Sequence, residues 1–117
     1  MQDFRKLLVW QRAHELAVNL ISATTRAERG HSALVAQARE SAASVAANIA
    51  EGTRRSTQKQ FANFLGIALG SLSETHNHLL PMRDAQVLPR ESIEPLLSNI
   101  EHLRPMLIVL RQRVLGS

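Results

Sequence analysis

The sequence has no cysteine, no tyrosine and no long apolar run. Without cysteine there is no disulfide framework, no thiolate metal site and no cysteine nucleophile. The longest apolar stretch, Met106 to Leu110, ends at Arg111, whereas a membrane-spanning helix needs about 18 apolar residues. Residues 1–6 open a mixed segment that lacks the apolar core of a signal peptide. We therefore expect a cytoplasmic protein that makes no contact with a membrane.

Residue patterns that carry catalysis or bind metals are also missing. There is no Gly-rich phosphate loop and no nucleophile elbow. His76 and His78 point about 200° apart on a helix, so they cannot share an ion. The one Glu-x-x-His pair, Glu28 and His31, falls in an expected loop. We therefore expect no enzymatic activity, no cofactor and no metal ion.

Glycine and proline are scarce, and Gly30, Gly52 and Pro89 fall between segments of helical periodicity. Apolar residues recur at helical spacing over residues 4–25, 33–51, about 58–84 and about 90–114. No segment shows the period-two alternation of a strand. Because short connections favour antiparallel neighbours, we expect one all-α domain, an antiparallel up-down-up-down four-helix bundle. In its first helix, one stripe holds Leu7, Trp10, His14, Ala17 and Ile21, and Val9, Ala13, Leu16 and Leu20 lie beside it. We expect His14 to lie at the flank.

Several residues mark the expected helix ends. Ser32 is a candidate N-cap, and Gly52 is a candidate residue directly after the second helix. Thr57 and Gln60 have the spacing of a capping box. Pro81 and Pro105 fall inside the third and fourth helices and should bend them.

Small residues exceed what the bundle core needs. Ala43 and Ala47 lie off the core stripe of the second helix, and Gly66 and Gly70 share a face of the third. Glycine in a helix interior costs roughly 0.5–1 kcal/mol relative to alanine, so two in register suggest a close approach by another helix. We interpret these four residues as oligomer packing positions. The alternative is tight packing within the monomer.

Two polar residues near the end of the second helix suggest a structural clamp. Asn48 lies beside the core stripe, and Glu51 lies in the last turn, where the helix dipole disfavours an anion. Arg54 and Arg55 follow within reach. We expect Asn48 and Glu51 to hold the next loop, with loss of Glu51 costing roughly 1–3 kcal/mol. A direct ligand contact is the alternative.

The chain has a net charge of +4, and twelve of its fourteen basic residues are arginine, which suits phosphate but also follows from genomic base composition. In the expected topology one end of the bundle carries a net charge of plus five, since its cations outnumber its two acids, Asp3 and Glu51. The other end is neutral, because Arg26, Arg29, Arg83 and Arg90 balance Glu28, Asp84, Glu91 and Glu94. We interpret the basic end as a nucleic-acid-binding surface; a solvated charge cluster is the alternative. Its cations are Arg5, Lys6, Arg54, Arg55, Lys59, Arg111 and Arg113.

Four sequence motifs carry a family resemblance. They are Val9-Trp10-Gln11-Arg12-Ala13, Gln37-Ala38-Arg39, the run from Ser44 to Gly52, and Phe61-x-x-Phe64-Leu65-x-Ile67-Ala68-x-Gly70-Ser71-x-x-Glu74. Together they resemble the 23S ribosomal RNA intervening-sequence proteins. The resemblance implies a bacterial four-helix bundle that assembles into a ring-shaped homopentamer. Some members are encoded inside intervening sequences of ribosomal RNA genes, and a related branch, the accessory variability proteins of diversity-generating retroelements, works with a reverse transcriptase and nucleic acid.

The sequence departs from the family pattern at three places. The first loop reads Arg26-Ala27-Glu28-Arg29-Gly30 in place of the usual Phe-Pro-x-x-Glu. Glu40 stands where a basic residue is common, and Gln86-Val87 replaces a familiar Gly-Tyr. Glu40 weakens a nucleic-acid role for the exposed face of the second helix.

These observations lead to two functional hypotheses. The first is a non-catalytic oligomer that binds RNA or another nucleic acid through its basic end. The second is an oligomeric scaffold that recruits a protein partner and does not touch nucleic acid. The four aromatic residues are expected in the core, where they could not stack on bases.

Overall fold

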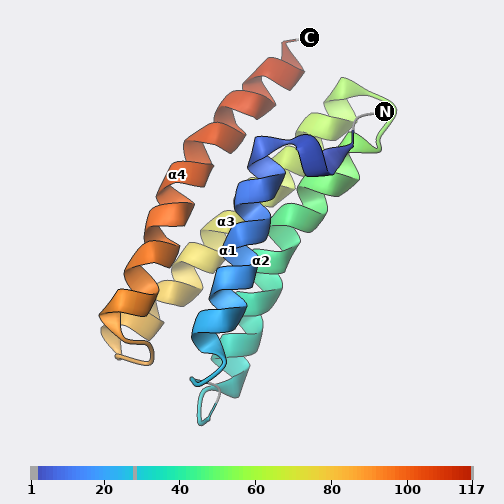
Figure 1. Ribbon diagram of the computed structural model, residues 1–117. Helices are drawn as coiled ribbons and strands as arrows, with labels where there is room; N and C mark the ends of the chain where they lie inside the picture. Colours follow the sequence, from blue (N-terminus) through green and yellow to red (C-terminus); the bar gives the residue numbers. More distant parts are fainter. Residues whose placement is uncertain (1–2, 28, 117) are drawn as a thin grey trace.

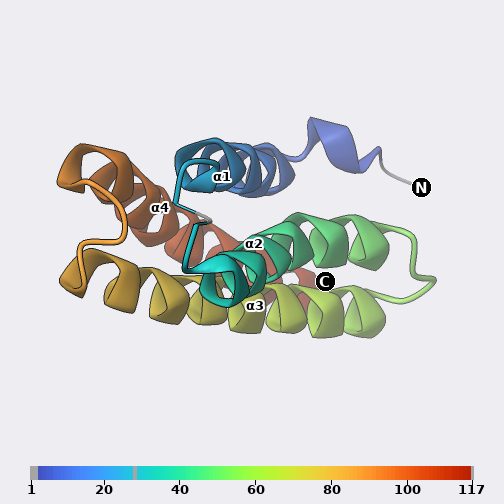
Figure 2. The same ribbon diagram turned by 90° about the horizontal axis from the view of Figure 1, so that it is seen from below.

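The computed structural model describes residues 3–27 and 29–116, and over these ranges it contains helices and no strand. A short 3-10 turn, η1 (Phe4–Lys6), precedes four helices: α1 (Leu8–Thr24), α2 (Ser32–Thr53), α3 (Gln58–Asp84) and α4 (Arg90–Leu115). Each helix packs against the one before it, and α1 also packs against α4. The result is a rod of 46 × 20 × 20 Å (Figures 1 and 2). The predicted up-down-up-down four-helix bundle is confirmed.

The core forms where one apolar stripe from each helix meets the other three. Its largest fully buried side chains include Leu16, Ile49, Leu72 and Leu103, one from each helix. In α1 the buried stripe is the row of Val9, Ala13, Leu16 and Leu20, continued by Thr24. The other stripe of the first helix, through Leu7, Trp10, His14, Ala17 and Ile21, flanks the core, and His14 and Ile21 are exposed.

The first predicted helix is interrupted near its start. The Asp3 carboxylate accepts a hydrogen bond from the Arg5 backbone N–H and caps η1, and Leu7 is extended, with φ −76° and ψ 127°. Phe4 packs edge-on against Trp10, with ring centroids 5.2 Å apart. Because the extended backbone of Leu7 interrupts the helix, α1 begins at Leu8 and not at Phe4.

The predicted ends of α2 are also corrected. Ser32 is the first residue of α2, and His31 takes the N-cap position without a side-chain hydrogen bond. Gly52 lies inside the last turn of α2 and is buried against α3. A Cβ at Gly52 would come 2.8 Å from Phe61 Cδ1 and 3.0 Å from Phe64 Cβ. Glycine at position 52 therefore lets α3 pack close to α2; it does not mark the end of α2.

The third and fourth helices match the predicted boundaries. The Thr57 hydroxyl accepts a hydrogen bond from the Gln60 backbone N–H at 3.1 Å, which confirms the N-cap half of the capping box. Pro81 and Pro105 lie inside α3 and α4 as predicted, and both helices continue through them.

Candidate nucleic-acid interface

The bundle topology brings the predicted basic residues to one end of the rod. Residues 54–57 connect α2 to α3 at this end, where the N-terminal segment and the end of α4 also lie (Figure 1). The other two connections lie at the opposite end. All seven predicted cations are therefore on, or within the last turns of, the same end of the bundle.

Three of these cations are open to solvent without a competing anion. Lys6, Arg54 and Lys59 are exposed, and within residues 3–27 and 29–116 no ion pair joins them to a carboxylate. They come from η1, from the turn after α2 and from the first turn of α3. These three side chains can meet phosphate groups without first breaking another contact.

Arg5 and Arg55 are exposed but paired. Arg5 Nε lies 3.1 Å from Asp3 Oδ1, and this hydrogen bond lowers the pKa of Asp3 below its ordinary value and raises the pKa of Arg5. Arg55 Nη2 lies 2.6 Å from Glu51 Oε1, and its guanidinium carbon lies 4.6 Å from the centroid of the Phe64 ring. Each of these arginines therefore brings a partly neutralised charge to the basic end.

The same contact shows what Glu51 does. It bonds the first residues after α2 through Arg55, but the side chains of Arg55 and Glu51 are 40% and 45% exposed. Exposed pairs contribute about 0–1 kcal/mol, so the expected loss of roughly 1–3 kcal/mol is too large. Solvent screening of both partners is the physical reason.

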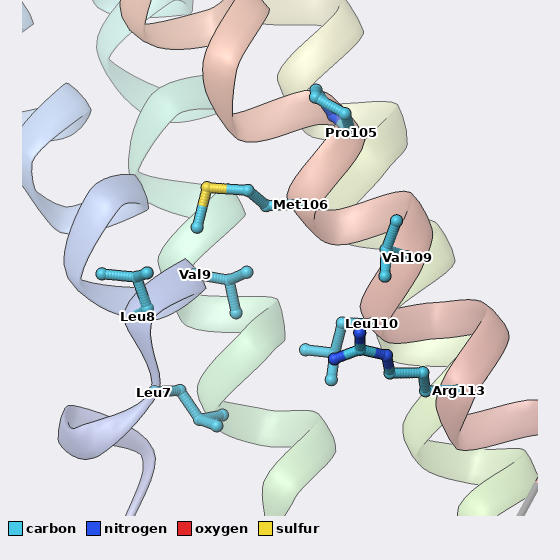
Figure 3. Close-up of a pocket in the computed structure, with 8 residues that line it drawn as sticks. All are labelled: Leu7, Leu8, Val9, Pro105, Met106, Val109, Leu110 and Arg113. Atoms are coloured by element: carbon cyan, nitrogen blue, oxygen red, sulfur yellow. The ribbon is translucent and has the colours of Figure 1, made fainter.

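Arg111 and Arg113 have different surroundings from the rest. The half-buried Arg111 donates from Nε to the Ala62 carbonyl oxygen at 3.1 Å and covers Gly66, whose Cβ position would lie 3.4 Å from the same nitrogen. Arg111 thus attaches α4 to α3 and is directed into the bundle, which argues against the predicted nucleic-acid contact. Arg113 is exposed and lines a groove between α1 and α4 (Figure 3).

A profile of the family described as 23S rRNA-intervening sequence protein matches residues 5–109. The chain belongs to this family. A solved structure with the same fold comes from Bacteroides thetaiotaomicron and is described as a protein of unknown function from the S23 ribosomal protein family. It superposes with a TM-score of 0.80 at 23% identity, over 89% of this chain and 98% of that one. No curated protein matches the sequence.

In this intervening-sequence protein, Asn48 does not clamp the loop after α2. Its Nδ2 donates to the backbone carbonyl of Ser44 at 2.8 Å and to the Ser44 hydroxyl at 2.9 Å. The Ser44 hydroxyl in turn lies 2.9 Å from that of Ser71 on α3. Asn48 therefore orients the contact between Ser44 of α2 and Ser71 of α3. It lies more than one helical turn before the loop that it was predicted to hold.

The contact belongs to a polar seam between α2 and α3 that the sequence pattern did not predict. A second hydrogen bond crosses the seam from the Thr75 hydroxyl to the Ser41 hydroxyl at 2.8 Å, and both residues are buried. The sequence feature that could have indicated these hydrogen bonds is the spacing of Ser41, Ser44 and Asn48, which places three polar residues on one side of α2.

The four predicted packing residues separate into two kinds. Gly66 is covered by Arg111, so it packs within the monomer, in line with the alternative interpretation. Ala43, Ala47 and Gly70 are exposed, and nothing lies within 4 Å of the position that a Cβ on Gly70 would take. These three remain available to another chain.

The aromatic residues are not buried in the core as predicted. All four are half-buried, and Trp10 lies between Phe4 and His14, with its ring stacked 4.8 Å from that of His14. Among the described residues, no three histidine or acidic side chains gather to hold a metal ion. Glu28, half of the one Glu-x-x-His pair, lies outside them. No helix in the described ranges is long and apolar enough to cross a membrane.

Proposed function

We propose that this protein is a non-catalytic, cytoplasmic oligomer that binds RNA or other nucleic acid through its basic end. The observation that carries the proposal is the set of three exposed, unpaired cations, Lys6, Arg54 and Lys59, at one end of the rod. In the ring-shaped homopentamer that the resemblance implies, cyclic symmetry repeats this end on every subunit. The basic ends then form one positive face, which attracts polyanions.

The proposed binding is to phosphate and not to bases. Lysine and arginine at the end of a helix pair contact phosphates without reading sequence. The half-buried aromatic rings are already packed against neighbouring side chains, so they offer no open stacking platform. Binding should therefore depend strongly on salt and weakly on RNA sequence.

The test compares two triple variants with equal loss of charge. In the first, Lys6, Arg54 and Lys59 become alanine; in the control, Arg26, Arg29 and Arg90, exposed at the opposite end, become alanine. Titration of a fluorescent single-stranded RNA at several salt concentrations gives the affinity and its salt slope. The first variant should bind more weakly, with a slope reduced by about 0.7 for each phosphate that the protein no longer neutralises. The control should bind like the wild type.

Two outcomes would contradict the proposal. One is a wild-type protein that ignores RNA at low salt. The other is an equal loss of affinity in both variants, which would mean that net charge alone attracts RNA and that the basic end has no special part.

A scaffold that recruits a protein partner is the second candidate function. The observation in its favour is the number of large apolar residues left exposed, among them Val18 and Ile21 on α1. A pull-down from the native cell that recovers one protein at fixed stoichiometry, without nucleic acid, would support the scaffold over the RNA-binding role.

A further inference from the structure

Arg55 has a fixed position at the basic end, although it lies in the turn between α2 and α3. Its backbone N–H donates to the Gly52 carbonyl oxygen at 3.2 Å, which attaches it to the last turn of α2. Its guanidinium carbon lies 4.6 Å from the centroid of the Phe64 ring. Phe64 in turn packs against Gly52, with its Cβ 3.0 Å from the position that a Cβ on Gly52 would take. The Arg55 side chain is therefore supported by both helices.

One edge of this guanidinium is occupied by a carboxylate. Arg55 Nη2 lies 2.6 Å from Glu51 Oε1, and among the described residues this is the one hydrogen bond that the side chain donates. A guanidinium has five N–H donors, so most of them stay open to solvent. The side chains of Arg55 and Glu51 are 40% and 45% exposed. A ligand can therefore reach both the arginine and its partner.

Arg5, the other paired arginine of the basic end, is bound differently. It donates to both carboxylate oxygens of Asp3, from Nε at 3.1 Å and from Nη2 at 3.2 Å. Asp3 also caps η1. Displacing Asp3 would therefore cost two charge-assisted hydrogen bonds and a cap, whereas displacing Glu51 from Arg55 costs one hydrogen bond. Within residues 3–27 and 29–116, no aromatic ring supports Arg5 as Phe64 supports Arg55.

A phosphodiester can take the place of the Glu51 carboxylate. Both groups are anions that present two oxygens, and arginine binds either of them through two parallel N–H···O bonds. Exposed ion pairs contribute little to stability, so the single bond between Arg55 and Glu51 breaks readily. The Phe64 ring keeps attracting the guanidinium after Glu51 has left, so the side chain stays oriented for the phosphate.

We infer that Arg55, supported by Phe64, is a preformed site for a backbone phosphate of RNA, and that Glu51 occupies this site in the free protein. The inference rests on the proposed function and adds a competitor to it: RNA binds Arg55 by displacing the Glu51 carboxylate. The three unpaired cations of the basic end attract the polyanion first, and Arg55 then exchanges one anion for another. Glu51 thus lowers the affinity of the basic end for RNA.

Neutralising one glutamate at each end of the rod tests this competition by titration of a fluorescent single-stranded RNA. Glu51→Gln should raise the affinity about two- to fivefold, the equivalent of one exposed ion pair. Glu94→Gln is the matched control, because Glu94 lies 3.7 Å from Arg90 at the same i,i+4 spacing at the opposite end. It removes the same charge and should raise the affinity by less. In a protein that carries Arg55→Gln, Glu51→Gln should do no more than Glu94→Gln.

Phe64 is a positioning residue, and its part is tested without a change of charge. Phe64→Leu should weaken RNA binding about two- to fivefold, as expected for the loss of an exposed cation–π contact. Phe64→Tyr keeps the ring and should bind like the wild type. Phe61→Leu is the control for packing, because Phe61 also lies against Gly52 but carries no stacked guanidinium among the described residues. The Glu51 variants leave the core intact, so they decide the question even where Phe64→Leu loses helical content.

Equal effects of Glu51→Gln and Glu94→Gln on RNA affinity would overturn the inference. So would a folded Phe64→Leu variant that binds RNA like Phe61→Leu. Either result would leave RNA binding by the basic end intact. A wild type that ignores RNA at low salt would overturn both the inference and the proposed function.

Discussion

Gln86 holds an unfavourable backbone conformation at the end of α3. Its φ is 58°, in the left-handed region. The Val87 N–H donates to the Met82 carbonyl at 2.8 Å and the Gln86 N–H to the Arg83 carbonyl at 3.2 Å, which is the hydrogen-bond pattern of a Schellman motif. This motif favours glycine at the left-handed position, and Gln86 stands where the family resemblance places a glycine. The turn therefore keeps its geometry at a cost in stability.

Replacing Gln86 with glycine should stabilise the protein. Left-handed backbone costs a residue with a Cβ about 1–2 kcal/mol, and the greater freedom of glycine in the unfolded chain offsets part of this gain. We expect a net increase of about 0.5–1 kcal/mol in the free energy of unfolding, measured by urea denaturation. Ala85→Gly, next to it at φ −90°, is the control and should destabilise. A loss of stability in Gln86→Gly would show that the turn is not strained.

The helices α2 and α3 approach each other closely at Gly52. The side chains of Phe61 and Phe64 occupy the space beside it, and farther along the polar seam joins the same two helices through Ser44 and Ser71. At one end the two helices are therefore joined by aromatic side chains packed on a glycine, and farther along by hydrogen-bonded hydroxyls.

Gly52→Ala should destabilise this helix pair although alanine favours helix. The added Cβ would lie 3.0 Å from Phe64 Cβ, an atom that moves only with its backbone. Overpacking of this kind costs about 1–3 kcal/mol, more than the roughly 0.5–1 kcal/mol gained in helix propensity.

Gly70→Ala is the matched control, because nothing lies within 4 Å of its Cβ position. It should raise stability by about 0.5–1 kcal/mol. Both variants are compared with the wild type at one protein concentration, since assembly makes apparent stability depend on concentration. Equal effects of the two substitutions would show that the approach of α3 does not require glycine at position 52.

At the scale of the whole molecule, the proposed assembly and the proposed RNA binding are coupled. One bundle offers few unpaired cations at its basic end, whereas an assembly whose rods lie side by side offers the same set once per subunit. A long RNA that contacts several subunits gains from their effective concentration, and a short RNA does not. Assembly should therefore strengthen the binding of long RNA.

Diluting the protein until light scattering shows a monomer should weaken its binding to long single-stranded RNA, because a monomer loses the added contacts of its neighbours. On an RNA short enough for one subunit, the difference should disappear. Equal affinity of monomer and assembly for long RNA would show that assembly does not contribute.

The sequence by itself determined the four helices, their antiparallel order and the gathering of basic residues at one end. These features follow from apolar periodicity and short connections, which act over a few residues and leave their pattern in the chain. The four motifs together indicated the family of the chain, and the family match over residues 5–109 confirms it.

Only the tertiary structure decided which residues on each helix face inward and which cations are free. Gly66 and Gly70 look alike in the sequence, but Arg111, which follows Gly66 by 45 residues, covers one and not the other. Likewise, η1 packs against α1 and α2 and not against α4, and a groove is left between α1 and α4. Contacts between distant segments depend on how whole helices pack against one another, and local spacing carries no record of that packing.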